Sequence, residues 1–221
     1  MIDVPSKFRI RRIFKPFVVK IARSLAKKGM TPNNATIVML LSSIGVFLYL
    51  VFVPLNWVTI AIYGGIVFSI GIFDGIDGSI ARITNTSSKF GGILDSSLDR
   101  ISDALIFFAP AARELFKNDM IDASVLKLSF LWIVPIWFWT ICLVIGAFMT
   151  SYIRARATLA DKRADTDVGL LGRSERLIII VILAILNLIP LAIVILAFLA
   201  NGTAIYRLIK ARNSLSKQIP D

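Results

Sequence analysis

Residues 74–99 read DGIDGSIARITNTSSKFGGILDSSLD, and the interpretation of the whole chain follows from this stretch. Four carboxylates fall within it: Asp74, Asp77, Asp95 and Asp99. Strongly apolar sequence flanks them at 62–73 and 105–112, and ionised groups in membrane segments are rare and usually functional. Spacings of three and four residues put each pair of carboxylates on one helix face. Two such faces would repel each other unless cations lay between them, so the stretch predicts a metal site.

The composition predicts an all-α integral membrane protein. The mean hydropathy is +0.78 and 57% of the residues are hydrophobic. Several apolar runs approach the length of a bilayer, and they lack the polar faces that helices of a soluble protein expose. We therefore expect one membrane domain over 1–221, with a juxtamembrane amphipathic segment at 1–30 and a six-helix transmembrane core at 31–212.

Six apolar runs are expected to span the membrane. Their predicted bounds are Asn34–Val53, Trp57–Ile83, Gly91–Ala112, Leu128–Tyr152, Leu177–Ile189 and Leu191–Ile209. Pro190 separates the last two and suits a tight reversal. The third run carries Asp95, Asp99 and Asp103 in its first half, so that half must face protein or water. Asp103 is expected to pair internally, with Arg100 or with a backbone group.

The segment 1–30 predicts a basic amphipathic helix that precedes the spans. Apolar residues recur at helical spacing from Phe8 to Leu25, and Lys and Arg fill much of the remainder. Such a helix lies on an anionic membrane surface. Pro16 is expected to kink or split it, and Thr31-Pro32-Asn33 has the form of a start signal for the first span.

The placement of Lys and Arg predicts the orientation. Of the 25 basic residues, 21 fall in four segments that would share one side: 1–31, 82–89, 154–176 and 207–217. The opposite loops hold only Arg113, Lys117 and Lys127. The positive-inside rule puts both termini and the Asp cluster on the cytoplasmic side of a multi-pass protein in the cell membrane. This bias also accounts for most of the net charge of +11, so no nucleic-acid partner is needed to explain it.

Position for position, residues 74–99 match the pattern D-x2-D-G-x2-A-R-x8-G-x3-D-x3-D, and the chain therefore resembles the CDP-alcohol phosphotransferases. The resemblance extends to the basic N-terminal helix and the six spans. Within the family it is closest to the phosphatidylinositol-phosphate and archaetidylinositol-phosphate synthases. The motifs that carry this closer match are Arg100–Asp103 (RISD), Ser151–Ala157 (SYIRARA) and Arg173–Ile179 (RSERLII).

The resemblance implies transfer from a CDP-activated lipid, CDP-diacylglycerol or CDP-archaeol, to an alcohol with release of CMP. It implies that Asp74 and Asp95 bridge two metal ions, that Asp77 holds one, and that Asp99 contacts the second and acts as the base. The chemistry agrees, because two divalent ions are the usual clamp for in-line displacement at phosphorus. The chain has no His and its ligands are carboxylate oxygens, so Mg²⁺ or Mn²⁺ is expected rather than zinc.

The resemblance also implies two binding regions. The residues that match CDP contacts of the family are Thr31, Pro32, Asn33, Asn34, Gly78, Arg82 and Ser88, for which helix packing and capping are the competing interpretation. The residues that match contacts to an inositol phosphate are Arg154, Arg176 and Arg207, with Arg156 and Arg173 as further candidates. Arg rather than Lys fills all five positions, and its forked guanidinium suits phosphate, although positive-inside bias alone also places Arg there.

The predicted function is transfer of a lipid phosphate to 1L-myo-inositol 1-phosphate. A related enzyme with another acceptor is one alternative, either glycerol 3-phosphate or an inositol compound that yields a soluble di-inositol phosphate. An ion or proton transporter is an alternative of another class, and it would place carboxylates near the midplane on several helices. Membrane lipids surround the protein in every case, and homodimers are common in the family that it resembles.

Overall fold

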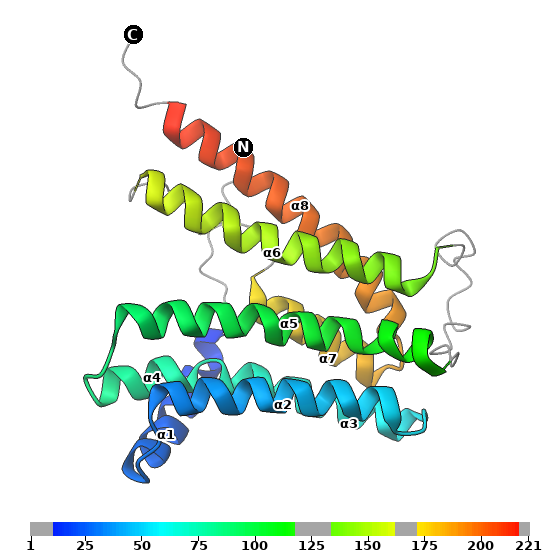
Figure 1. Ribbon diagram of the computed structural model, residues 1–221, viewed down its shortest axis with the longest axis horizontal. Coiled ribbons are helices and arrows are strands. Elements are labelled where there is room, and N and C mark those ends of the chain that lie inside the picture. Colours follow the sequence, from blue (N-terminus) through cyan, green and yellow to red (C-terminus); the bar gives the residue numbers. More distant parts are fainter. Residues whose placement is uncertain (1–10, 118–133, 162–171, 217–221) are drawn as a thin grey trace.

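The computed structural model describes residues 11–117, 134–161 and 172–216, and every regular element in these ranges is an α-helix. The helices are α1 (Arg11–Lys27), α2 (Pro32–Phe52), α3 (Trp57–Phe73), α4 (Ile76–Ile83), α5 (Lys89–Lys117), α6 (Ile136–Ala160), α7 (Arg173–Ile185) and α8 (Ile189–Ser216). The long helices lie side by side, and α4 and the start of α5 lie at one end of the bundle (Figure 1).

The first span, α2, begins as its sequence predicts. Thr31 is the N-cap, its hydroxyl accepts a hydrogen bond from the Asn34 N–H at 3.2 Å, and Pro32 occupies the first turn. Proline is tolerated there because the first N–H groups of a helix have no partner inside it. α2 packs against α5, and the buried hydroxyls of Ser43 and Ser102 form a 2.5 Å hydrogen bond between the two helices.

The predicted span 57–83 is two helices rather than one. α3 ends at Phe73, Asp74 caps it, and α4 begins at Ile76. Gly75 lies at the break, where an added Cβ would come within 3.1 Å of Val18 on α1. The close approach of α1 explains why a small residue follows Asp74.

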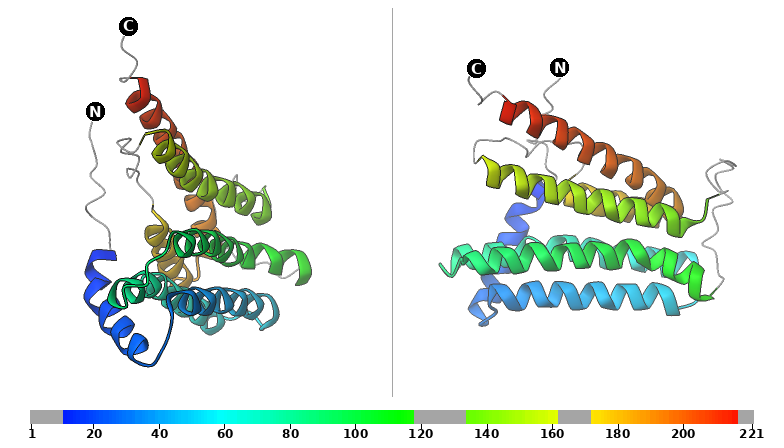
Figure 2. Two further views of the ribbon diagram at one scale, coloured as in Figure 1. Left: turned by 60° about the vertical axis from the view of Figure 1, so that its left-hand side comes forward. Right: turned by 45° about the horizontal axis from the view of Figure 1, so that its top comes forward.

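α1 crosses the long helices at a steep angle, near the end of the bundle where α4 lies (Figure 2). It packs on α4 through Val18 and Ala22, which lie against Ile76 and Ile80. Pro16 lies inside α1 and does not end it, so the predicted split is absent. The Phe8 end of the expected amphipathic pattern lies outside the described residues.

The reversal between α7 and α8 lies earlier than predicted. α7 ends at Ile185, and Asn187 adopts a positive φ of 58° in the turn that follows. Asn tolerates this left-handed conformation better than most residues. Pro190 does not form the turn, because α8 begins at Ile189 and takes Pro190 into its first turn.

Four helical segments in the described residues are long and apolar enough to cross a membrane: Pro32–Phe52, Trp57–Ile83 (α3 followed by α4), Ile136–Ala160 and Ile189–Ser216. The other two expected spans do not meet that standard. α5 carries four charged residues between positions 95 and 103. α7 has 13 residues and is about 20 Å long at 1.5 Å per residue, which is less than a bilayer core. The start predicted for the fourth span, Leu128, lies outside the described residues, and α6 begins after Pro135.

Candidate functional site

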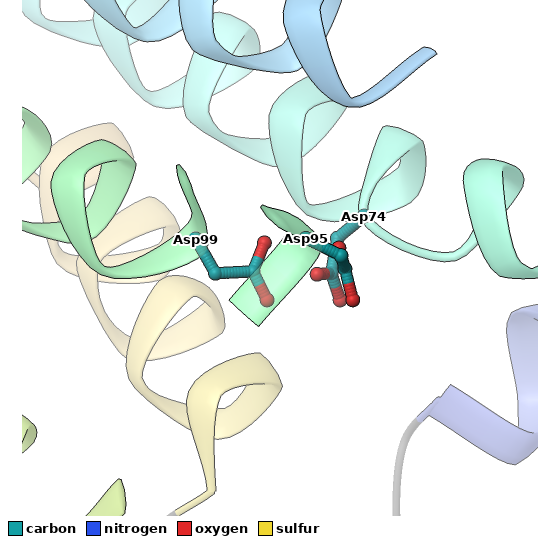
Figure 3. A group of neighbouring side chains, drawn as sticks. All are labelled: Asp74, Asp95 and Asp99. Atoms are coloured by element: carbon teal, nitrogen blue, oxygen red, sulfur yellow. The ribbon is translucent and has the colours of Figure 1, made fainter. Parts of the chain in front are cut away.

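Three carboxylates, one from the end of α3 and two from α5, converge beside the break between α3 and α4. Asp74 caps α3, and Asp95 and Asp99 lie one turn apart on α5. One oxygen from each lies within 4.8 Å of the others, and Figure 3 shows the three side chains turned toward one another. The i, i+4 spacing on α5 produces this geometry because it stacks two side chains on one helix face.

Asp77 lies beside this group but is not one of its three members. It is in the first turn of α4 and is 6% exposed. The Thr36 hydroxyl on α2 has one proton and donates it to Asp77 Oδ2 at 2.9 Å, with the Pro32 carbonyl oxygen a more distant acceptor at 3.2 Å. Thr36 therefore orients Asp77 and joins α2 to the site.

Arg173, the first residue of α7, pairs with three of the carboxylates. Its Nη1 forms an ion pair with Asp74 and another, at 2.8 Å, with Asp99 Oδ1. Its Nε donates to Asp103 Oδ1 at 2.8 Å. The other oxygen of Asp103 accepts from Arg176 Nη2 at 2.9 Å. Internal pairing of Asp103 was expected, but its partners are these two arginines, and the guanidinium of Arg100 turns back to the Ser96 carbonyl oxygen.

A cavity of about 580 Å³ opens beside this network. Its lining includes five carboxylates (Asp74, Asp95, Asp99, Asp103 and Glu175) and five guanidiniums (Arg100, Arg154, Arg173, Arg176 and Arg207). The formal charges of the lining balance. Divalent cations at the carboxylates would make the cavity positive, which suits an anionic ligand.

A second cavity, of about 200 Å³, lies on the α2–α4 side of the carboxylates. Five of the residues expected to contact CDP line it: Pro32, Asn33, Gly78, Arg82 and Ser88. Thr31 and Asn34 are not in the lining, and their hydrogen bond caps α2. The Ser88 hydroxyl accepts from the Gly91 N–H at 2.9 Å, so Ser88 also helps to start α5.

The five arginines expected at the acceptor differ in their surroundings. Arg154, Arg173, Arg176 and Arg207 line the larger cavity, and Arg156 is not in the lining. Arg207 is buried and its Nη1 donates to the Thr150 carbonyl oxygen at 2.8 Å, which ties α8 to α6.

The sequence analysis gave no role to Thr36 and expected only internal pairing for Asp103. The sequence gives only a weak indication that Thr36 belongs to the site: it is a polar residue one turn after a helix start, in a largely apolar run. Asp103 has a clearer one, because it continues the four-residue spacing of Asp95 and Asp99. Its arginine partners come from 70 and 73 residues away, so no local pattern identifies them.

The three clustered carboxylates suit a hard divalent cation. Asp74 is buried, and the buried Oδ1 of Asp95 has no hydrogen-bond partner in the part of the chain that the structure describes. A buried carboxylate oxygen without a donor is unfavourable, and a cation removes that penalty. Carboxylate oxygens are the preferred ligands of Mg²⁺ and Mn²⁺.

Comparison with known proteins gives one consistent answer. The sequence profile of the family described as "CDP-alcohol phosphatidyltransferase" matches residues 29–206. A protein named archaetidylinositol phosphate synthase, from Pyrococcus horikoshii, is 34% identical over 208 residues, which are 94% of this chain and 97% of the relative. A phosphatidylinositol phosphate synthase from Mycobacterium tuberculosis is 31% identical over 178 residues, which cover 78% of this chain and 71% of the relative.

Solved structures agree with the sequence relatives. The crystal structure of Mycobacterium tuberculosis phosphatidylinositol phosphate synthase with CDP-DAG bound has a TM-score of 0.68 and 26% identity, and the match covers 88% of this chain and 92% of that one. A second structure of that protein, in complex with manganese and citrate, has a TM-score of 0.69 and 26% identity, with 88% of each chain covered.

Proposed function

Since the chain belongs to the CDP-alcohol phosphatidyltransferase family and is an enzyme of it, we propose that it transfers the lipid phosphate of CDP-diacylglycerol or CDP-archaeol to 1L-myo-inositol 1-phosphate and releases CMP. Family membership also removes the transporter alternative. The relatives named above are synthases of both lipid types, so the proposal covers either kind of lipid chain.

One observation carries the proposal: Asp95 lines both cavities. The smaller cavity holds residues that match CDP contacts of the family, and the larger one holds the arginines. A donor in the first and an acceptor in the second would meet at the carboxylates between them. Two substrates that must react in line need such an arrangement.

The transfer itself needs a base beside the acceptor hydroxyl. We assign this role to Asp99, which lines the larger cavity beside Asp95. The acceptor oxygen forms a bond to the lipid-bearing phosphorus while the bond from that phosphorus to the CMP oxygen breaks. The hydroxyl proton passes to the Asp99 carboxylate, and CMP leaves from the smaller cavity.

Asp74, Asp77, Asp95 and Asp99 are proposed to hold two divalent ions, Mg²⁺ or Mn²⁺. The related structure in complex with manganese supports metal binding in this fold. When bound, the ions would neutralise the charge that develops on the pyrophosphate oxygens. Thr36 keeps the Asp77 carboxylate in position through its 2.9 Å hydrogen bond.

The acceptor is proposed to be a phosphorylated polyol because of the arginines. Arg154, Arg176 and Arg207 approach one cavity from three helices. Guanidinium groups bind phosphate through paired N–H donors. A phosphate monoester would bring an anionic acceptor to these guanidiniums, and a neutral polyol would not.

The proposed setting is the cell membrane, with both termini and both cavities at the cytoplasmic face. The four apolar helices support a membrane protein. The positive-inside distribution supports the orientation, and it puts the site where soluble inositol phosphate is available. α5 and α7 would complete six membrane-embedded helices because their polar ends face the cavities, and α1 would lie at the interface.

The test is an assay of the purified full chain with CDP-diacylglycerol and with CDP-archaeol. Each donor is offered inositol 1-phosphate, free inositol, glycerol 3-phosphate and serine, and CMP release and lipid product are measured. We expect turnover with inositol 1-phosphate well above that with the other acceptors. Equal turnover with free inositol contradicts the acceptor assignment, and faster turnover with glycerol 3-phosphate replaces it.

A further inference from the structure

Asp103 joins two arginines at the wall of the larger cavity. Its Oδ1 accepts from Arg173 Nε at 2.8 Å, and its Oδ2 accepts from Arg176 Nη2 at 2.9 Å. Asp103 is 3% exposed and Arg176 is 4% exposed. Each carboxylate oxygen therefore fixes one guanidinium, in surroundings where an unpaired charge would be strongly unfavourable.

The proposed metal chemistry does not use Asp103. Its oxygens are not part of the group formed by Asp74, Asp95 and Asp99, and both of them already accept hydrogen bonds. Asp103 does not line the smaller cavity either. The function of this buried carboxylate must be sought in the arginines that it holds.

Those arginines keep hydrogen-bonding capacity for a further anion. A guanidinium carries five N–H donors, and Asp103 takes one from each. Arg176 Nε is buried with no hydrogen-bond partner among the described residues. Arg173 extends from Asp103 to Asp74 and Asp99, so one side chain links the carboxylate cluster to the arginine wall.

We propose, resting on the function above, that Asp103 is a positioning residue for the acceptor. It holds Arg173 and Arg176 beside the carboxylate cluster, so that their remaining N–H groups bind the phosphate of a phosphate monoester. The position of the two guanidiniums then makes the acceptor phosphate a requirement, because their remaining N–H donors, Arg176 Nε among them, gain no anionic acceptor when a neutral polyol enters.

The two possible roles of Asp103, charge balance and positioning, predict opposite effects of Asp103→Asn on phosphate affinity. If Asp103 only reduced the positive charge of the cavity, Asp103→Asn would leave an additional positive charge and would tighten phosphate binding. If Asp103 positions the arginines, the same change releases both side chains and weakens binding. The sign of the effect therefore distinguishes a positioning role from a charge-balancing one.

The experiment uses the purified full chain at saturating Mn²⁺, with saturation checked for each variant by electron paramagnetic resonance. Binding of inorganic phosphate is titrated calorimetrically, and steady-state kinetics are measured with inositol 1-phosphate. Asp103→Asn is expected to weaken phosphate binding roughly 10- to 100-fold, the range for loss of hydrogen bonds to charged groups. KM for the acceptor should rise by a similar factor while kcat changes less than about threefold.

Two further variants complete the design. Asp103→Glu keeps the charge and should give a phosphate affinity between those of the unmutated chain and Asp103→Asn. Ser102→Ala removes a buried hydrogen bond from the neighbouring position without touching the arginines, and its phosphate affinity should be unchanged. If thermal unfolding shows that Asp103→Asn does not fold, Asp103→Glu carries the test, and weaker binding than in the unmutated chain is still expected.

Unchanged or tighter phosphate binding in the folded Asp103 variant overturns the proposal, and so does an unmutated chain that binds no phosphate. Failure of the proposed function would look different. It would appear as equal turnover of inositol and inositol 1-phosphate by the unmutated chain. The phosphate titration involves no turnover, so it decides the role of Asp103 in that case as well.

Discussion

The Tyr63 hydroxyl donates a 2.8 Å hydrogen bond to the carbonyl oxygen of Ile106 in α5. Within a helix that carbonyl would accept from the residue four positions later, which is Pro110, and proline has no N–H. Tyr63 on α3 is fully buried. One phenol therefore supplies the donor that the proline removes, and it explains how α5 keeps a proline inside a 29-residue helix.

Tyr63→Phe is expected to destabilise the protein by about 1–3 kcal/mol, because it leaves the buried Ile106 carbonyl unpaired. Thermal unfolding of the purified chain in one detergent measures the change. Tyr152→Phe is the matched control, since Tyr152 is 58% exposed. Equal midpoints for the two variants would mean that the Ile106 carbonyl finds another donor.

The crossing of α6 and α8 gives a second stability prediction. An added Cβ at Gly146 would lie 2.8 Å from the backbone nitrogen of Asn201, whereas one at Gly202 would meet nothing within 4 Å. Gly146→Ala should therefore cost about 1–3 kcal/mol through overpacking. Gly202→Ala should be neutral or stabilising by up to about 1 kcal/mol, because Ala favours helix. A Gly146→Ala protein as stable as Gly202→Ala contradicts the observed crossing.

The features that follow from local sequence were predictable. Apolar runs gave most of the helix positions, because a membrane helix depends on its own composition. The shared face of Asp95 and Asp99 followed from helical spacing, since residues four apart lie on one side of a helix. The same argument paired Asp74 with Asp77, but Asp74 caps α3, Asp77 lies in α4, and the group of three leaves Asp77 out. The break after Asp74 was missed although the sequence becomes polar there, with Asp-Gly pairs at 74–75 and 77–78. The close approach of α1 at Gly75 comes from a distant segment and could not be predicted.

Contacts between distant segments were not predictable. Arg100 was a natural partner for Asp103, being three residues away on the same helix, yet Asp103 pairs with Arg173 and Arg176 on α7. Arg173 was expected as a further contact to the acceptor, and its ion pairs with Asp74 and Asp99 had no signal in the sequence. From sequence alone, positive-inside bias is sufficient to explain a basic residue at a helix end. Only the fold identifies the acidic side chains that it contacts.

Loss of a metal ligand should abolish turnover. Asp74→Asn and Asp95→Asn each remove charge that divalent ions would neutralise, so both variants should fold but bind Mn²⁺ more weakly and show no transfer. Electron paramagnetic resonance titration of Mn²⁺ and CMP release are the measurements. Asp161→Asn, at the end of α6, is the control and should behave as the unmutated chain. Activity that survives exhaustive chelation would exclude a metal-dependent mechanism.

Asp99→Asn separates the base from the ligands. If Asp99 accepts the proton of the acceptor hydroxyl, the variant should bind CDP-lipid with little change while the rate falls by roughly 10² to 10⁴, as for removal of a general base. Donor binding is measured by displacement of a labelled CDP-lipid, and the rate by single turnover. A parallel loss of donor binding and rate would assign Asp99 to metal holding alone.

Substitutions in the two cavities should change the KM values of different substrates. Arg82 lines only the smaller cavity and Arg207 only the larger one. Arg82→Gln is therefore expected to raise KM for the CDP-lipid, and Arg207→Gln to raise KM for inositol 1-phosphate, each roughly 10- to 100-fold because a charged hydrogen bond to phosphate is lost. Arg212→Gln, an exposed change further along α8, is the control for surface charge.

The diagnostic quantity is the ratio of the two KM changes within each variant. Arg207 also donates to the Thr150 carbonyl oxygen, so unfolding midpoints must first show that Arg207→Gln remains folded. If the cavities bind different substrates, the ratio reverses between Arg82→Gln and Arg207→Gln. A similar rise of both KM values in both variants would mean that donor and acceptor share one charged surface, and it would contradict the assignment of one substrate to each side of Asp95.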